Sequence, residues 1–455
     1  MLKSSGKGAG IAPDTRGTLP TETIRKQETA KGPPPLLRDY AEARASFSWE
    51  AEAARLGTSL AGPLNLGALA VGRGGSLVWH GARGEETRLS PADLARGSAR
   101  FASLLGKLGL RKGEPVLLVT RACPELVFAF LGALRFGAVP AVLGRLRSAD
   151  SLRHILEGTG AGLALVEPPF KAVLDPLRRA VPSLRHVVVL WKEGVPPRLG
   201  PGEVSWENAF EGAGETFQDV LLPADHPAYL HYSELGMSGA VTPHSAAFAL
   251  ASSAGSALDL RAGDGAITLT VPGDPIFVPY SILAPLLVGA TTFLFEDPVR
   301  FTGFGGFKDP VHVWYSPVRA IDVVLRVDPG LADILGKCRH IAVTYPYDPS
   351  FIVMTQASYG SPLHPTWWPR ELGVIQSAEF RAADIRVGSI GRPLPGVEMA
   401  IDRNSGCLAV RLGPGSPFSG YWKDPEQTAR RVKDGWFVAD PRGRMDPDGY
   451  AWIVA

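Results

Sequence analysis

The sequence contains few cysteines and no Cys/His cluster of the kind that marks small disulfide-bonded or zinc-binding proteins. Its 455 residues include three cysteines, Cys123, Cys338 and Cys407, which are widely separated. No Cys-x-x-Cys pair is present, so the pattern predicts neither a disulfide framework nor a zinc site. A reducing, cytoplasmic location is therefore the expectation.

Long runs of like charge and long apolar runs are also missing. The formal net charge is +2 and no run of like charges is long, whereas a nucleic-acid-binding surface needs a basic stripe. The most apolar stretch, residues 126–143, is interrupted by Arg135 and is short for a membrane span. No apolar segment follows the basic residues near the N-terminus, as a signal peptide would require. We therefore expect neither a nucleic acid nor a membrane as a partner.

A regular alternation of strand-like and helix-like segments is what the sequence does contain. Apolar runs such as residues 114–119 are typical of strands buried on both faces of a parallel sheet. They alternate with segments of helical character such as residues 124–136, and Ser90 followed by Pro91 is the start signal of another helix. Strands alternating with helices of this length predict a doubly wound α/β fold.

These segments divide the chain into four predicted parts. Residues 1–36 are rich in Gly, Lys, Thr and Pro and low in apolar residues, which predicts a disordered tail. Residues 37–225 and residues 226–384 both show the α/β alternation and are expected to form two subdomains. In residues 385–455, short β segments between Gly, Pro and Asp turns predict a small β-barrel or β subdomain.

Several motifs occur in the order found in one enzyme family. The chain has Arg-Leu-Ser-Pro-Ala-Asp-Leu at 88–94, Pro-Glu-Leu at 124–126, Gly-Ala-Val at 137–139, Trp-Tyr-Ser at 314–316, Thr-Trp-Trp at 366–368 and Gly-Arg-Pro-Leu-Pro-Gly-Val-Glu at 391–398. From residue 38 to 455 the sequence resembles the AMP-forming acetyl-CoA synthetases of the adenylate-forming superfamily. The resemblance implies the N-terminal body of that fold, with two doubly wound α/β subdomains and a small β-barrel subdomain.

The resemblance also implies a reaction and its cofactors. In this family a carboxylate attacks the α-phosphate of ATP to give an acyl-adenylate, and the thiol of CoA then takes the acyl group. ATP or AMP, Mg²⁺ and CoA are the ligands that such a reaction would use. Four motifs that should handle the nucleotide depart from the family pattern, whereas scaffold positions such as Leu283-Ala284-Pro285 keep it.

The phosphate-binding loop shows the largest departure. The family sequence is similar to Tyr-Thr-Ser-Gly-Thr-Thr-Gly-Lys-Pro-Lys-Gly, in which small residues expose backbone N–H groups and lysine adds a positive charge. Here the strand at 227–232 is followed by Ser-Glu-Leu-Gly-Met-Ser-Gly at 233–239, which contains no lysine. At ~4 Å and an effective dielectric constant of ~20, repulsion between Glu234 and a phosphate would cost ~4 kcal/mol. We predict an ordinary surface loop that is unfit to hold ATP.

The segments for adenine and ribose differ as well. The family's Gly-Glu-Pro is replaced by Thr344-Tyr345-Pro346, so the glycine that lets the base approach the backbone is missing. Tyr345 could fill the adenine pocket or stack on a ligand. For ribose, an ungapped comparison places Pro441 at the family's aspartate position, with Asp440 one residue early. In an extended strand that shift turns the side chain to the opposite face, unless a bulge returns Asp440 to the ribose.

A fourth motif carries the candidate metal ligand. It reads Pro-Thr-Trp-Trp-Pro-Arg-Glu-Leu-Gly at 365–373, and Glu371 matches the family's magnesium-associated glutamate, which makes it the one catalytic candidate. Arg370 could pair with Glu371 or with a bound anion. Trp368 matches the tryptophan that limits a small acyl pocket, although it and Trp367 could equally pack in a core.

The sequence ends at Ala455, where the family continues with an Arg-containing hinge and a mobile lid that brings the catalytic lysine. A body without that lid could neither exclude water from the adenylate nor build the CoA tunnel. The leading hypothesis is a pseudoenzyme that binds an acyl or nucleotide-like ligand, or serves another protein as a partner subunit. The alternatives are an acyl-CoA ligase whose lid domain comes from another chain, and a structural scaffold.

Overall fold

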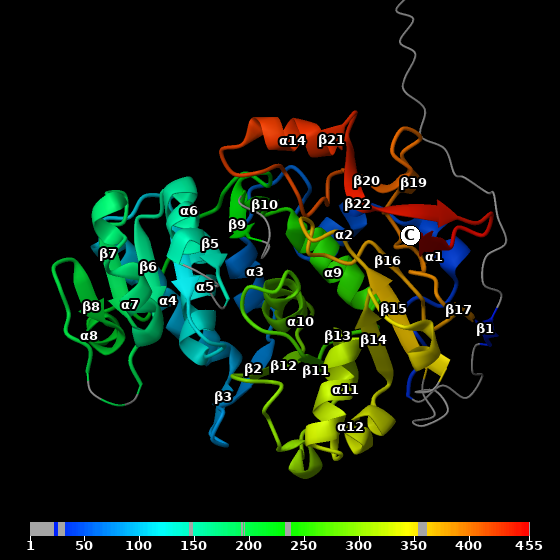
Figure 1. The fold of residues 1–455 in the computed structure, drawn as a ribbon, viewed down its shortest axis with the longest axis horizontal. Helices are drawn as coiled ribbons and strands as arrows, with labels where there is room; N and C mark the ends of the chain where they lie inside the picture. The colour runs from blue at the N-terminus through cyan, green and yellow to red at the C-terminus, as the bar shows by residue number, and fades with distance from the viewer. Residues whose placement is uncertain are drawn as a thin grey trace, which may run out of the picture.

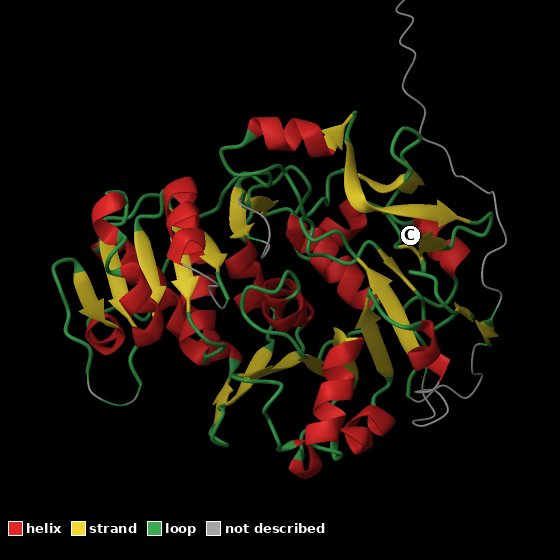
Figure 2. Ribbon diagram, viewed as in Figure 1, coloured by secondary structure: helices red, strands yellow, loops and turns green. Residues whose placement is uncertain are grey.

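The computed structural model describes residues 22–25, 32–144, 149–192, 194, 196–232, 238–353 and 362–454. The predicted disordered tail at 1–36 lies mostly outside these ranges, and so do residues 233–237 of the lysine-free loop, including Glu234. In the described part, helices and strands alternate along most of the chain (Figure 2). The α/β class predicted from the sequence is confirmed.

Seven strands form the first sheet, and the chain enters it in the middle. The order is β10-β9-β5-β4-β6-β7-β8, and all neighbours are parallel except β9 and β10. From β4 the chain adds β5 on one side and then β6, β7 and β8 on the other, so the crossover helices cover both faces. The strands are β4 (Pro115–Val119), β5 (Val139–Val142), β6 (Leu163–Val166), β7 (His186–Val189), β8 (Glu203–Ser205), β9 (Pro227–His231) and β10 (Ala240–Pro243). The helices of this part are α4 (Pro91–Lys107), α5 (Pro124–Phe136), α6 (Ala149–Thr159), α7 (Pro168–Leu174) and α8 (Trp206–Glu211).

Nine strands form the second sheet, in the order β18-β16-β15-β14-β13-β11-β12-β2-β3. Its centre, from β15 to β2, is parallel, and antiparallel strands close both edges. The strands are β2 (Ser76–His80), β3 (Glu86–Leu89), β11 (Gly265–Thr268), β12 (Thr291–Phe295), β13 (Val313–Pro317), β14 (His340–Thr344), β15 (Leu363–Trp367), β16 (Ser377–Ala378) and β18 (Arg392–Pro393). The helices are α3 (Leu66–Gly72), α9 (Ala246–Ser256), α10 (Ala284–Val288), α11 (Val318–Val327) and α12 (Leu331–Lys337), with a π-helical segment at Phe277–Leu283.

Helix α4 begins where the sequence predicts. The Ser90 side chain accepts a hydrogen bond from the backbone N–H of Asp93 (3.2 Å), and the Asp93 carboxylate accepts one from the backbone N–H of Ser90 (3.0 Å). This reciprocal capping satisfies two backbone donors that the first turn leaves unpaired, and Pro91 supplies a preset helical φ. The next helix, α5, ends at Gly137, whose φ of +86° is the left-handed conformation that glycine adopts without strain.

The two sheets share one layer of helices, which gives the molecule five layers (Figure 1). Helices α3, α5, α9 and α10 pack between the sheets, and their apolar side chains join one core with the inner faces of both. In β4, Val116 and Leu118 point into this shared core, whereas Leu117 and Val119 point to the outer core beneath α6 and α7. The outer face of the second sheet is covered by α11 and α12. Both faces of the parallel strands are therefore buried, which explains their continuous apolar runs.

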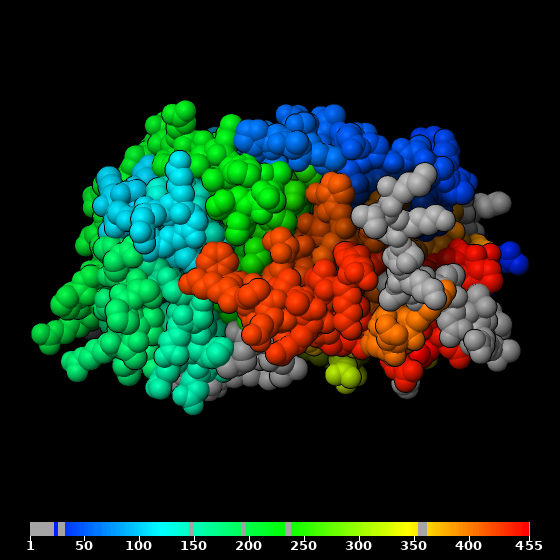
Figure 3. All heavy atoms as spheres, turned by 90° about the horizontal axis from the view of Figure 1, so that it is seen from above, coloured from blue at the N-terminus to red at the C-terminus, as the bar shows by residue number. Residues whose placement is uncertain are grey.

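The C-terminal part forms a separate, curled five-stranded sheet. Its order is β19-β20-β22-β21, and β23 also pairs with β22. On the face shown in Figure 3, its orange and red atoms lie beside the green and cyan atoms of the first α/β part. The elements are β19 (Met399–Ile401), β20 (Cys407–Arg411), α14 (Pro425–Arg431), β21 (Val432–Lys433), β22 (Trp436–Met445) and β23 (Ala451–Ile453).

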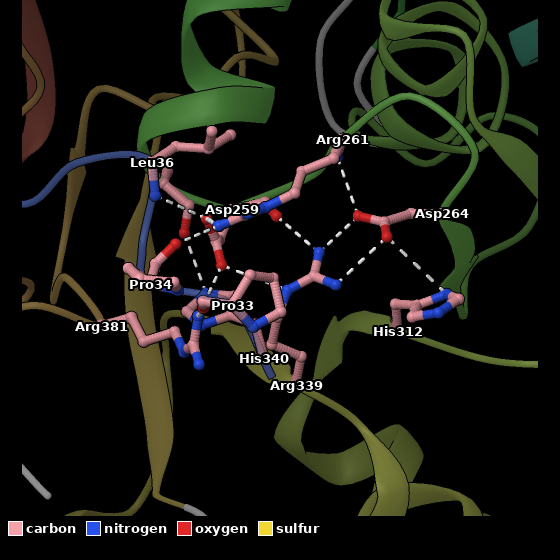
Figure 4. A network of polar contacts seen from close by, with 11 residues as sticks. Pro33, Pro34, Leu36, Asp259, Arg261, Asp264, His312, Arg339, His340 and Arg381 are labelled. Atoms are coloured by element: carbon pink, nitrogen blue, oxygen red, sulfur yellow. Dashed lines mark hydrogen bonds and ion pairs between the residues drawn. The ribbon is translucent and has the colours of Figure 1, made fainter. Parts of the chain in front are cut away.

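A short N-terminal strap, defined here as residues 32–36, is tied to the body beside the end of α9. The backbone N–H of Leu36 donates to Asp259 Oδ1 (2.8 Å), and Arg381 Nη1 donates to both the carbonyl of Pro33 (2.8 Å) and Asp259 Oδ2 (2.9 Å). These residues converge in Figure 4. On either side of the strap, β1 (Thr23–Ile24) pairs with β17 (Ile385–Arg386), and α1 (Tyr40–Ser46) and α2 (Trp49–Arg55) begin the folded body.

The same network continues inward beneath the second sheet. Arg339 donates to Asp259 Oδ2 (3.2 Å) and to Asp264 Oδ1 (3.1 Å), and its side chain is almost fully buried. Arg261 donates to Asp259 Oδ1 (2.9 Å) and to the carbonyl of Pro34. Paired and hydrogen-bonded in this way, the buried charges are compensated. The strap supplies backbone partners that complete the pairing.

Sheet membership crosses the predicted division of the chain. Strands β2 and β3 come before residue 90 but belong to the second sheet, whereas β9 and β10 come after residue 225 but belong to the first. The boundaries at 36/37, 225/226 and 384/385 stay predictions. Within the described residues, no helix combines the length and apolar character needed to cross a membrane.

Candidate functional site

The predicted motifs meet where the carboxyl ends of β9, β14 and β15 face the C-terminal sheet. Ala240 of β10, Trp367 of β15 and Phe437 of β22 share one apolar cluster. Ala240 also forms a β-bridge with Tyr421, just before α14. The carboxyl ends of strands in open α/β sheets are where ligands bind. We therefore place the candidate site here.

Glu371 is engaged by two residues that the sequence did not single out. Its Oε1 accepts a hydrogen bond from the Tyr421 hydroxyl (3.0 Å) and lies 3.5 Å from Arg431 Nη2. The predicted alternative was an ion pair between Arg370 and Glu371; among the described residues, the cation paired with Glu371 is Arg431 instead. Burial and the Glu371 carboxylate both raise the pKa of Tyr421, so its hydroxyl stays a proton donor.

Arg431 also holds Asp440. Its Nη1 lies 2.5 Å from Asp440 Oδ1, and this hydrogen bond is the main cause of the raised pKa of Arg431. The pairing of β20 with β22 is irregular here, since Ala409 opposes Val438 whereas Cys407 opposes Arg442. The two extra residues in β22 form the kind of bulge that re-aims a side chain. Asp440 thereby points to Arg431 and remains 75% exposed.

Arg370 faces a different neighbour. Burial and the nearby Arg370 guanidinium lower the pKa of His231, at the end of β9, to about 4. Arg370 is exposed, and no carboxylate of the described residues pairs with it. It therefore places a positive charge, unpaired among the described residues, near the start of the 233–239 loop. Of the two alternatives for Arg370, contact with a bound anion stays a prediction.

The two tryptophans diverge, as neighbouring side chains at the end of a strand do. Trp367 is 4% exposed and packs with Leu372 and Phe437 in the cluster beneath the C-terminal sheet. Trp368 is half-buried, and its Nε1 donates to the Tyr315 hydroxyl (3.0 Å). Trp367 thus lies in a core, and Trp368 retains a partly open face that could contact a ligand.

Tyr345 lies at the end of β14, next to the same cluster. Its backbone N–H donates to the carbonyl of Thr366 (3.0 Å), and its half-buried ring meets Tyr347 edge-on at 6.0 Å between centroids. A half-buried ring in this position is compatible with filling the adenine pocket and with stacking on a ligand. Both interpretations stay predictions.

The described residues do not form a magnesium site by themselves. Mg²⁺ requires several oxygen ligands in octahedral geometry, but Glu371 Oε1 is already occupied by Tyr421 and Arg431. Across the described ranges, no group of three or more His, Cys, Asp or Glu side chains is arranged to hold a metal ion. The exposed Asp440 carboxylate is held in place by Arg431 and can still accept a hydrogen bond from a hydroxyl group.

Sequence reasoning missed Arg431 and Tyr421. Arg431 is one of two adjacent arginines at the end of α14, a common place for basic residues because they complement the helix dipole. Nothing local distinguishes it from Arg430, and its partners are 60 and 9 residues away. The signal that could have identified Arg431 is a comparison of the acidic residues in the nucleotide-handling motifs with the basic residues elsewhere in the chain.

Similar proteins of known sequence include acyl-activating enzymes. The chain is 26% identical over 446 residues to acetyl-coenzyme A synthetase of Bacillus subtilis, covering 92% of this chain and 77% of that protein. It is 27% identical over 369 residues to 3-hydroxybenzoate–CoA ligase of Aromatoleum, covering 75% and 67%. For acetyl-coenzyme A synthetase of Chlorobaculum tepidum, the chain spans 63% of that protein's length at 24% identity.

Solved structures share the fold. An acyl-CoA synthetase of Brucella canis superposes with a TM-score of 0.82 at 23% identity, covering 92% of this chain and 80% of that one. Anthranilate CoA ligase AuaEII, solved with anthranoyl-AMP, gives a TM-score of 0.75 at 19% identity. A family model described as AMP-binding enzyme matches residues 72–422. Together with the motif order and the two doubly wound sheets, this match shows that the chain belongs to the AMP-binding enzyme family.

Proposed function

We propose that this acetyl-CoA synthetase-like protein binds an AMP-like or acyl-adenylate-like ligand but has lost ATP-dependent acyl adenylation, and that it acts as a ligand-binding or partner subunit. The observation that carries the proposal is the position of Arg431. It engages both Glu371, the candidate metal ligand, and Asp440, the candidate ribose ligand. A protein cation is thus paired with the candidate metal ligand.

The charges around the site favour a small anion over a triphosphate. The 233–239 loop contains no lysine and does contain Glu234. Arg370 is the one residue of the 365–373 motif that offers an unpaired positive charge among the described residues. A single phosphate or carboxylate could be met by one guanidinium, whereas a triphosphate needs several donors and a cation.

Two measurements on the purified chain test the proposal. Isothermal titration with AMP and with a non-hydrolysable acyl-adenylate analogue, without added metal, should show binding. Asp440→Asn should weaken it several-fold, whereas the matched control Asp434→Asn, on the exposed turn before β22, should not. Pyrophosphate exchange with acetate, propionate and related acids should stay at background.

The main alternative is a working acyl-CoA ligase whose lid domain is a separate chain. The names of the relatives, acetyl-coenzyme A synthetase and hydroxybenzoate–CoA ligase, favour it. Robust exchange, by the chain alone or with a co-encoded lid protein, would establish this alternative and overturn our proposal. If AMP, the analogue and CoA all fail to bind and a stable protein partner is captured instead, the scaffold hypothesis replaces both.

A further inference from the structure

Arg431 bridges two carboxylates from different parts of the fold. Glu371 follows β15 of the second sheet, and Asp440 belongs to β22 of the C-terminal sheet. Separate nitrogens of the guanidinium face them, with Nη2 3.5 Å from Glu371 Oε1 and Nη1 2.5 Å from Asp440 Oδ1. The planar, permanently charged fork of arginine is suited to holding two carboxylates in fixed directions. The positive charge of the guanidinium offsets the repulsion that the carboxylates of Glu371 and Asp440 would otherwise exert on each other.

The surroundings make this charge difficult to replace. The side chains of Arg431 and Glu371 are 23% and 19% exposed, so their interaction is only partly screened by water. The Tyr421 hydroxyl donates to the same Glu371 oxygen and leaves it no free coordination direction on that side. An incoming divalent cation would be repelled by the guanidinium as it approached Glu371.

The rest of α14 does not compensate for the loss of Arg431. The neighbouring Arg430 is 71% exposed and pairs with Glu426 at 3.6 Å. Asp424, at the start of the helix, is used by Ser238 and by the backbone N–H of Gln427. Removal of Arg431 would therefore leave two carboxylates facing one gap with no protein cation between them.

We propose that Arg431 takes the place of a divalent cation as the counter-charge of Glu371 and Asp440, so that the site keeps its shape without metal and admits a divalent cation only when Arg431 is removed. This inference rests on the proposed function, because it explains how a member of this family could bind a ligand without the metal of the adenylation reaction. It assigns Arg431 a positioning role, since it acts through the two carboxylates.

Binding of Mn²⁺, followed by electron paramagnetic resonance, tests the inference on the full chain. Wild type and the matched control Arg430→Met should not bind Mn²⁺ at this site. Arg431→Met should bind it with a Kd at least ~10-fold below the highest Mn²⁺ concentration at which wild type shows no binding, because a unit positive charge is removed from beside two carboxylates. Adding Glu371→Gln to Arg431→Met should abolish the gained binding. Arg431→Lys, which keeps the charge, should behave as wild type.

Two results would overturn the inference. One is that wild type binds Mn²⁺ and that Glu371→Gln removes this binding. This test does not depend on the folding of any Arg431 variant. The other is a folded Arg431→Met that gains no Mn²⁺ affinity. These outcomes are separable from failure of the proposed function: pyrophosphate exchange by a wild type that binds no Mn²⁺ through Glu371 would defeat that function and leave the role of Arg431 standing.

Discussion

The hydroxyl of Ser238 donates a 2.7 Å hydrogen bond to Asp424 Oδ2, although 186 positions separate the two residues. Asp424 Oδ1 accepts a second bond from the backbone N–H of Gln427 (2.9 Å) and so caps α14. One carboxylate therefore ties the described end of the lysine-free loop to the helix that ends with Arg431. The position of α14 depends on a contact made by its N-cap residue, Asp424.

Removal of the Asp424 carboxylate should destabilise both the loop end at Ser238 and helix α14. We expect Asp424→Ala to lower Tm roughly twice as much as Ser238→Ala, because it removes the partners of two hydrogen bonds rather than of one. Asp424→Asn should be close to wild type at the cap, since asparagine also caps helices. Differential scanning fluorimetry of the three variants checks the order. Equal effects of Asp424→Ala and Ser238→Ala would contradict the assignment.

The N-terminal strap offers a second test with a matched pair at one position. The Leu36 side chain is exposed, but its backbone N–H donates to buried Asp259. Leu36→Pro removes that donor and should cost about 1.5–3 kcal/mol, the range for hydrogen bonds to charged groups. Leu36→Ala keeps the donor and should cost little. Urea unfolding measures both, and limited proteolysis before residue 37 should accelerate only in Leu36→Pro.

Stability should depend on pH in a direction set by buried histidines. Burial is the main cause that lowers the pKa of His244 and of His340 to about 3, of His231 to about 4 and of His364 well below its ordinary value. The unfolded chain takes up these protons near pH 6.5, whereas the folded chain does not. Each group therefore removes about 1.4 kcal/mol of stability per pH unit as the pH falls below that value. Burial also raises the pKa of Glu379 to about 8, which acts in the opposite direction.

The two trends should place maximum stability near pH 6.5. Above that pH, the contribution of neutral Glu379 is lost as the pH rises through 8; below it, the histidines dominate because they outnumber Glu379. Chemical unfolding from pH 4.5 to 8.5 should show this maximum. Glu379→Gln, which stays uncharged, should flatten the alkaline side and make the acid side somewhat steeper, because the contribution that opposes the histidines is removed. An unchanged alkaline slope in this variant would count against a buried, protonated Glu379.

The neighbouring tryptophans should differ in what their loss affects. Trp367 is buried in the cluster beneath the C-terminal sheet, so Trp367→Ala should destabilise the fold by about 3–5 kcal/mol. Trp368 is half-buried, and Trp368→Ala should cost less while weakening the binding of an acyl-adenylate analogue. Unfolding and titration of both variants check the contrast. A reversal of the two effects would assign the ligand-facing role to Trp367.

Local signals in the sequence predicted much of the fold. Ser90, Asp93 and Pro91 mark the start of α4 because capping acts over a few residues, and the apolar run at 115–119 marks a strand buried on both faces. The sheet to which each strand belongs was harder to predict from the sequence. Strands β2 and β3 lie in the second sheet although they precede the first sheet in the chain, since strand partners are chosen by packing over long sequence separations.

The candidate site likewise contains residues that the sequence predicted and residues that it did not. Glu371, Asp440 and Trp368 were found because motif order places them, but the ion pair between Glu371 and Arg431 spans 60 residues and leaves no local pattern. Adjacency in sequence also suggested Glu371 as the partner of Arg370, whereas Glu371 pairs with Arg431 and the charge of Arg370 helps to lower the pKa of His231.

The shared helical layer has a consequence for how the molecule denatures. Helices α3, α5, α9 and α10 bury the inner faces of both sheets, so neither sheet can melt without hydrating the other's inner surface. We call each sheet with its outer helices a lobe. If one lobe unfolded alone, this common interior would be exposed to water, while the lobe that stayed folded would gain no conformational entropy. The two lobes should therefore give a single calorimetric endotherm, whose enthalpy reflects the combined size of both.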